Sequence, residues 1–182
     1  MYEIIKAPNA TLAKKAKPVK KIDKSILAII ERMKQSLLAA KDPIGVGLAA
    51  PQIGESLQIF MAKPSDKSQI HVFINPRLEV IGGSTTRKPR KNSKEIKLEG
   101  CLSLPNIWGE VKRNDTLSLS YMDEKGILKT KKVTGFLSTI VQHEMDHLNG
   151  VLFPKRVLEQ KGKLYKSEKN EKGEDVFEEI EI

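Results

Sequence analysis

The fold prediction depends on one stretch, residues 135–148, which reads GFLSTIVQHEMDHL. Its apolar residues recur at helical spacing and predict a helix with one buried face. On such a helix His143 and His147 are one turn apart, so both imidazoles project toward the same ion. Glu144 lies just off that line, where its carboxylate can reach a water held by the ion without being a ligand. The H-E-x-x-H pattern therefore predicts a hydrolytic metal site on a buried helix.

A third ligand is needed, because a catalytic metal site usually has three protein ligands and one open position. Cys101, the only cysteine, lies in the segment EGCLSLP at 99–105, where Gly100 permits close backbone approach. The remaining histidine, His71, falls on an expected strand, which favours a packed or surface role. Cys101 is therefore the predicted third ligand. The alternatives are an inert buried thiol and a chance motif on a packed helix.

Composition indicates one globular domain over residues 1–182. A single cysteine cannot form an intramolecular disulfide, which suits a reducing compartment. The N-terminal segment lacks the apolar core of a secretory signal, and no apolar run approaches the length of a membrane span. We therefore expect a cytoplasmic protein that makes no membrane contact.

The net charge of +9 favours transient contact with polyanions such as RNA or the ribosome. A lysine-rich, well-solvated surface is the simpler interpretation, because net charge specifies no partner. Aromatic residues make up only 5% of the chain, so no base-stacking platform is indicated. Specific nucleic-acid recognition is therefore not expected, whereas transient ribosome contact stays open.

The rest of the chain predicts an α+β domain, with antiparallel sheets packed around a central helix that carries the H-E-x-x-H motif. An amphipathic helix is expected over residues 23–40, with Asp23 as its N-cap and Asp42-Pro43 as its stop. Strands are expected at 57–62, 70–75, 77–81 and 117–122, and the last pairs through a turn at 123–126 with 127–133. Residues 84–97 are expected to form a basic loop insertion, and 163–182 a C-terminal hairpin or tail with strands at 164–168 and 175–180.

Three segments resemble the signature motifs of the peptide deformylase family: GVGLAAPQ at 45–52, EGCLS at 99–103 and QHEMDH at 142–147. Similarity extends from YEII at 2–5 to GVLF at 150–153. The family removes the formyl group from the N-terminal formyl-methionine of nascent polypeptides and releases formate. The resemblance implies one divalent metal ion per chain, with Fe2+ as the expected cellular metal and Zn2+, Ni2+ or Co2+ as substitutes.

The same resemblance implies a role for each matching residue. The catalytic positions are Glu144, Gln52 and Leu102, the metal ligands are Cys101, His143 and His147, and the substrate-binding backbone is that of Val46, Gly47 and Gly100. Glu144 takes a proton from the attacking water and returns it to the leaving amine. The backbone N–H of Leu102 and the side-chain amide of Gln52 donate to the developing oxyanion.

Further expectations concern the surroundings of the site. An apolar methionine pocket is expected from Val46, Thr139, Ile140 and His143. Asp146 and Arg113 are expected to pair behind the metal ligands. Trp108 stands where many bacterial members carry an arginine that flanks the substrate, so the peptide preference is expected to differ. The segment beyond Pro154 does not match the C-terminal helix that some members use on ribosomes, which argues against docking through it.

Two other functions fit parts of the sequence. A metalloprotease that cuts internal peptide bonds would use Glu144 but neither Cys101 nor Gln52, so a Cys101→Ser variant with intact metal and activity would favour it. A basic, non-catalytic protein with a structural metal site would need a fourth protein ligand, and none is evident beside these three. Deformylation is therefore the predicted reaction, and a monomer is the expected state.

Overall fold

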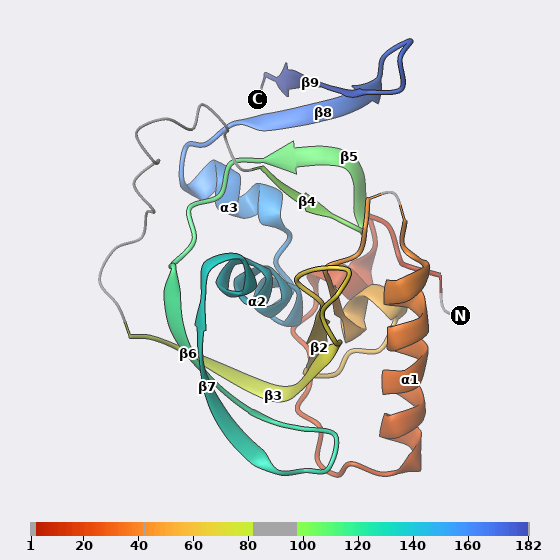
Figure 1. Ribbon diagram of the computed structural model, residues 1–182, viewed down its shortest axis with the longest axis vertical. Coiled ribbons are helices and arrows are strands. Elements are labelled where there is room, and N and C mark those ends of the chain that lie inside the picture. Colours follow the sequence, from red (N-terminus) through yellow and green to blue (C-terminus); the bar gives the residue numbers. More distant parts are fainter. Residues whose placement is uncertain (1–2, 42, 82–97, 182) are drawn as a thin grey trace.

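The computed structural model describes residues 3–41, 43–81 and 98–181. The expected basic loop at 84–97 and the expected helix stop at Asp42 lie outside these ranges. Within them, helix α2 (Gly135–Leu148) lies between a five-stranded and a four-stranded antiparallel sheet (Figure 1). The expected α+β class is confirmed, and α2 carries the H-E-x-x-H motif.

The five-stranded sheet has the order β1-β2-β3-β6-β7. Its strands are β1 (Gly47–Ala49), β2 (Ile59–Ala62), β3 (His71–Val80), β6 (Thr116–Met122) and β7 (Leu128–Thr134). The β6–β7 hairpin was expected, and its turn is held by Asp123, whose carboxylate accepts hydrogen bonds from the backbone of Lys125 and Ile127. β1 is a terminal strand of this sheet and lies against α2.

Strand β3 corrects one prediction, because the two strands expected at 70–75 and 77–81 are one strand with a bulge. The register against β6 shifts between Ile74 and Arg77. Asn75 has a φ of +49°, and its side-chain amide exchanges two hydrogen bonds of 2.8 Å with the backbone of Val19. The bulge absorbs Pro76, which has no N–H to donate, and pairing continues beyond it.

The four-stranded sheet has the order β4-β5-β8-β9. Its strands are β4 (Glu99–Cys101), β5 (Leu104–Gly109), β8 (Leu164–Lys169) and β9 (Asp175–Ile180). The β8–β9 pair is the expected C-terminal hairpin. Strands β1, β4 and β5 and the short helix α3 (Phe153–Glu159) were not expected from the sequence.

Helix α1 (Lys24–Ala39) confirms the amphipathic prediction, because Ile29, Ile30, Met33 and Leu37 are buried on one face. Asp23 caps it by accepting hydrogen bonds from the N–H groups of Ser25 and Ile26, the second and third residues of the helix. Short 3-10 helices occur at Ala10–Ala13 and Ala50–Ile53. The second of these follows β1 directly and therefore places Gln52 near the centre of the molecule.

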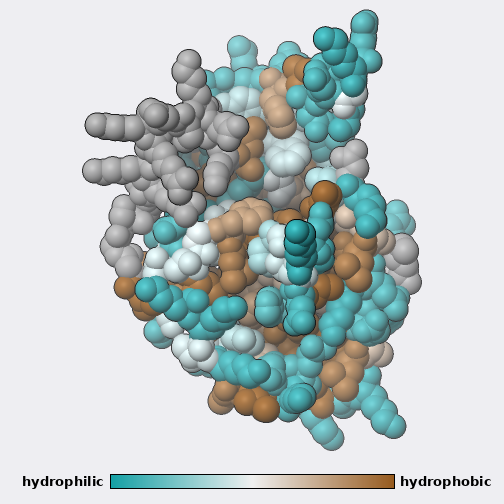
Figure 2. All heavy atoms as spheres, viewed as in Figure 1, coloured by the Kyte–Doolittle hydropathy of each residue, from teal (hydrophilic) through white to brown (hydrophobic). Residues whose placement is uncertain are grey.

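Three apolar clusters hold the elements together. One lies under α1, one packs α2 on the five-stranded sheet, and one surrounds Cys101 with Phe153, Val157 and Leu164. The face seen in Figure 2 is largely hydrophilic, with apolar patches between the polar side chains. None of the helices in the described ranges is long and apolar enough to span a membrane.

Candidate metal centre

The three predicted ligands meet where the two sheets face each other across α2. Cys101 ends β4, and His143 and His147 lie one turn apart on α2. Their ligand atoms all lie within 4.8 Å of one another. The Cys101 Sγ atom is 3.2 Å from Nε2 of His147, and both residues are buried. The fold therefore brings Cys101 to two histidines that lie 42 and 46 residues further along the chain.

The donor set fits a divalent transition metal. One thiol sulfur and two imidazole nitrogens are the donors that such ions prefer in catalytic sites with an open position. Burial holds the pKa of His147 well below its usual value, so its ring is neutral. A neutral imidazole is the form that binds a metal. Glu144 Oε2 is buried and has no hydrogen-bond partner among the residues described, so it is an unpaired acceptor beside the three ligands.

Glu144 is suited to accept and return a proton. Its side chain is buried, and this burial raises the pKa of the carboxyl to about 7. A group with a pKa near neutrality can act in both directions of proton transfer. Its Oε1 atom lies against the backbone of Gly47, where a Cβ would collide with it. β1 therefore fixes the carboxylate from one side.

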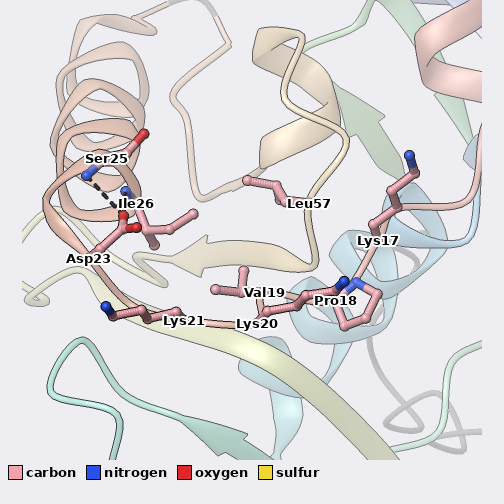
Figure 3. Close-up of a pocket in the computed structure, with 9 residues that line it drawn as sticks. All are labelled: Lys17, Pro18, Val19, Lys20, Lys21, Asp23, Ser25, Ile26 and Leu57. Atoms are coloured by element: carbon pink, nitrogen blue, oxygen red, sulfur yellow. Dashed lines mark hydrogen bonds between the residues drawn. The ribbon is translucent and has the colours of Figure 1, made fainter.

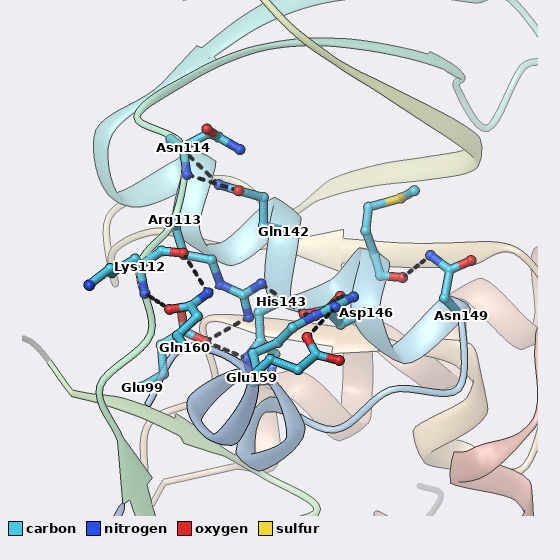
Figure 4. A network of polar contacts seen from close by, with 12 residues as sticks. Glu99, Lys112, Arg113, Asn114, Gln142, His143, Asp146, Asn149, Glu159 and Gln160 are labelled. Atoms are coloured by element: carbon cyan, nitrogen blue, oxygen red, sulfur yellow. Dashed lines mark hydrogen bonds and ion pairs between the residues drawn. The ribbon is translucent and has the colours of Figure 1, made fainter. Parts of the chain in front are cut away.

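A network of charged side chains orients His143 from behind (Figure 4). Glu99 Oε2 lies 3.2 Å from Nδ1 of His143, which leaves Nε2 of that ring for the metal. Arg113 donates to both oxygens of Glu99 at 2.8 and 2.9 Å, and to Asp146 at 2.8 Å. Burial alone raises the pKa of Glu99, but the hydrogen bonds from His143 and Arg113 outweigh it and hold the pKa below its usual value. The charged carboxylate is therefore the stable form.

This network contains one predicted pair and two residues that the sequence did not single out. The Arg113–Asp146 ion pair was expected, and it is present. Arg156 on α3 also donates to Asp146, at 2.7 Å, but α3 itself was not expected. Glu99 belongs to the EGCLS motif, but the sequence assigned it no role. Its position two residues before the predicted ligand Cys101 was the only sign that it lies near the metal site. His71 is exposed at the start of β3, as expected.

The two predicted oxyanion donors lie beside Cys101. Gln52 is buried, and its Oε1 atom accepts a hydrogen bond from the N–H of Ala49 at 2.9 Å. Its Nε2 atom therefore points the other way, toward Ser103 Oγ at 3.1 Å and Cys101 Sγ at 3.8 Å. The N–H of Leu102 donates to no other atom in the described part of the chain. The Gln52 amide is therefore held in one orientation, and the Leu102 N–H has no acceptor among the described residues.

The predicted substrate residues lie on the terminal strands of the two sheets. Gly47 belongs to β1 and Val46 precedes it, whereas Gly100 is the middle residue of β4. β1 and β4 each have one strand neighbour within the described ranges, so each has an open edge. Val46 also packs in the same apolar cluster as Ile140 of α2.

Comparisons with known proteins point in one direction. A sequence profile described as polypeptide deformylase matches residues 1–163. Peptide deformylase 1 of Bacillus cereus is 36% identical over 157 residues, which cover 86% of this chain and 92% of that protein. Peptide deformylase of Prochlorococcus marinus strain MIT 9312 is 40% identical over 158 residues, covering 85% of this chain and 73% of that protein.

Solved structures agree. The peptide deformylase of Thermotoga maritima superposes with a TM-score of 0.74 at 35% identity, covering 86% of this chain and 97% of that one. A peptide deformylase from Synechococcus elongatus, in complex with actinonin, gives a TM-score of 0.73 at 35% identity, covering 85% and 78%.

Proposed function

The chain belongs to the peptide deformylase family, a metal-dependent hydrolase that removes the N-terminal formyl group from nascent polypeptides, and from this premise we propose a role for each site residue. Cys101, His143 and His147 hold one divalent ion, which supplies a Lewis acid that lowers the pKa of a water and polarises the formyl carbonyl. We propose Fe2+ in the cell, with Zn2+, Ni2+ or Co2+ as substitutes, since a thiolate with two imidazoles accepts any of them.

Glu144 moves the protons of the reaction. Its free Oε2 atom accepts a proton from the attacking water and then delivers it to the leaving amine of methionine. Nε2 of Gln52 and the N–H of Leu102 donate hydrogen bonds to the formyl oxygen as negative charge develops on it. The orientation of the Gln52 amide by Ala49 supports this assignment, because it turns the donor side toward Cys101.

The substrate peptide enters as an added strand between β1 and β4. Backbone groups of Val46, Gly47 and Gly100 pair with it, a mode that tolerates varied side chains. The methionine side chain lies against α2 in a pocket formed by Val46, Thr139, Ile140 and His143. The open edges of the two strands support this placement.

The meeting of Cys101 with His143 and His147 carries the proposal, because a protease of the ordinary H-E-x-x-H type has no use for Cys101. The test is formate release from formyl-Met-Ala-Ser by Fe2+-loaded protein prepared without oxygen. The parent is expected to release formate, whereas Glu144→Gln retains the metal and loses turnover. Cys101→Ser with unchanged metal content and activity would contradict the ligand set.

We further propose a single-domain monomer in the cytoplasm that contacts the ribosome transiently through a basic segment, residues 14–21. Lys14, Lys15, Lys17, Lys20 and Lys21 are exposed, and none forms an ion pair with another described residue. Figure 3 shows three of these lysines around a hollow of about 510 Å³ with an apolar floor of Val19, Ile26 and Leu57. The exposed lysines of this segment suit the phosphates of ribosomal RNA.

Cosedimentation with ribosomes at two salt concentrations tests this contact. The parent is expected to cosediment more weakly as salt rises, and Lys20→Glu with Lys21→Glu is expected to abolish the binding. Lys67→Glu with Lys172→Glu, two exposed lysines outside this segment, is the control matched in charge. Equal cosedimentation of all three proteins would exclude the segment. Gel filtration at several protein concentrations tests the oligomeric state, and a monomer is expected to elute at the same volume at each concentration.

A further inference from the structure

The indole of Trp108 bridges three strands of the four-stranded sheet. Trp108 lies on β5, opposite Gly100 of β4 and Tyr165 of β8. Its Nε1 atom donates to Ser167 Oγ on β8 at 2.9 Å. At the opposite side of the indole, Cζ3 lies 2.7 Å from the place where a Cβ of Gly100 would be. The six-membered ring therefore covers Gly100.

The C-terminal hairpin holds this indole from a second side. Phe177 of β9 meets the indole edge-to-face, with ring centroids 5.7 Å apart and an interplanar angle of 83°. Ser167 and Phe177 are directly paired in the β8–β9 register, so they present their side chains on one face of the hairpin. Both lie beyond residue 163, where the match to the family profile ends. This chain thus uses a segment outside that match to fix the orientation of Trp108.

Gly100 connects this clamp to the substrate. β4 has an open edge, and the proposed function pairs the peptide backbone with Gly100 there. Residues directly opposite each other on neighbouring strands project to the same face of a sheet. Because Gly100 has no side chain, the indole and the side chain of the peptide residue beside Gly100 can meet over it.

We propose that Trp108 is a specificity-determining residue that selects large apolar side chains at the substrate position beside Gly100, and that Ser167 and Phe177 are positioning residues that hold it. This inference rests on the proposed deformylation, but it concerns the peptide and not the formyl group. The clamp keeps one indole rotamer, so the ring is already in place when the peptide binds.

Peptide kinetics provide the first test. The metal-loaded full chain is assayed with formyl-Met-X-Ser and formyl-Met-Ala-X, in which X is glycine or leucine. At one of these positions the KM of the parent is expected to be about two- to tenfold lower for leucine than for glycine, with similar kcat. A difference of this size corresponds to the free energy of a single aromatic contact. Ser167→Ala and Phe177→Ala are each expected to reduce this KM ratio at least twofold, whereas Ser167→Thr is expected to retain it. Val176→Ala is the matched control. Val176 is exposed on β9 next to Phe177, but it pairs with Glu168 and not with Ser167.

Fluorescence provides the second test, because Trp108 is the only tryptophan. Ser167→Ala and Phe177→Ala are expected to shift the emission of the free protein and lower its anisotropy, whereas Val176→Ala changes neither. The product peptide Met-Leu-Ser is expected to change the emission of the metal-loaded parent more than Met-Gly-Ser does, or Met-Ala-Leu more than Met-Ala-Gly.

The outcomes separate the two proposals. A uniform loss of activity on every peptide, or an unaltered leucine preference in both hairpin variants, would overturn the role of the clamp. A parent that releases no formate would overturn the proposed function. In that case the peptide-induced change in Trp108 emission still decides between a peptide-contacting indole and a purely structural one.

Discussion

At the scale of one residue, the absence of a side chain at Gly47 makes room for the carboxylate of Glu144. A Cβ at Gly47 would collide with Glu144 Oε1 and would lie 2.9 Å from Cγ2 of Ile140. Both neighbours are on α2, which is packed against β1 and cannot move away without cost. The sequence suggested Gly47 for its backbone alone, and its contact with the Glu144 carboxylate is visible only in the folded structure.

Gly47→Ala is expected to lower formate release by about 100-fold or more, because the added methyl group displaces the carboxylate that transfers the proton. The metal content, measured by elemental analysis, should stay near one ion per chain because no ligand is touched. Gly173→Asn is the control, since Gly173 has a φ of +77° that asparagine tolerates and no atom within 4 Å of a built Cβ. Full activity in Gly47→Ala would show that Glu144 has more room than its contacts imply.

Glu99 is expected to support the metal through His143. Glu99→Gln removes the charge that faces the imidazole and Arg113, so the affinity for Zn2+ should fall about 10- to 100-fold. Competition with a chromophoric chelator measures this affinity. Glu79→Gln, on the exposed side of β3, should leave it unchanged. An unaltered affinity in Glu99→Gln would mean that the ring is held by packing alone.

At the scale of elements, the bulge in β3 links the five-stranded sheet to the segment that precedes α1. Asn75 tolerates a positive φ and binds both backbone groups of Val19. Asn75→Ala is expected to lower the free energy of unfolding by about 1–3 kcal/mol, because two partly buried backbone groups lose their partner. Urea denaturation measures the change, and Arg77→Ala, exposed on the same strand, is the control. An equal effect of both changes would contradict a specific role for the asparagine.

The sequence predicted those elements that carry their own local signal. The two long helices have an apolar period, α1 also has its Asp23 cap, and the β6–β7 hairpin has alternation around a turn. β1 and β4 have three residues each, which is too short for a period, and they form because β2 and β5 pair with them. The three ligands Cys101, His143 and His147 could be predicted from the motifs. The contacts of Glu99, Arg156 and Ser103 were not, because they depend on how the two sheets face each other.

At the scale of the whole molecule, the metal site joins the two halves. Cys101 comes from the four-stranded sheet, whereas His143 and His147 come from the helix packed on the five-stranded sheet. Removal of the metal by a chelator is therefore expected to lower the melting temperature. A free ion at 100 times its Kd contributes about 2.7 kcal/mol. Calorimetry with and without Zn2+ measures the shift, and Cys101→Ala should lose most of it. A metal-independent melting temperature would mean that apolar packing alone joins the sheets.

The strand β9 has a consequence for how copies of the protein meet one another. It has one strand neighbour in the described ranges, so its other edge presents unpaired backbone groups over six residues, Asp175–Ile180. Such an edge is a template for pairing with a second copy, and for growth into aggregates. Asp175, Glu178 and Glu179 are exposed along it. Charged side chains along an edge strand oppose such pairing, and here Asp175 and Glu179 are each ion-paired with a lysine, Lys169 and Lys163.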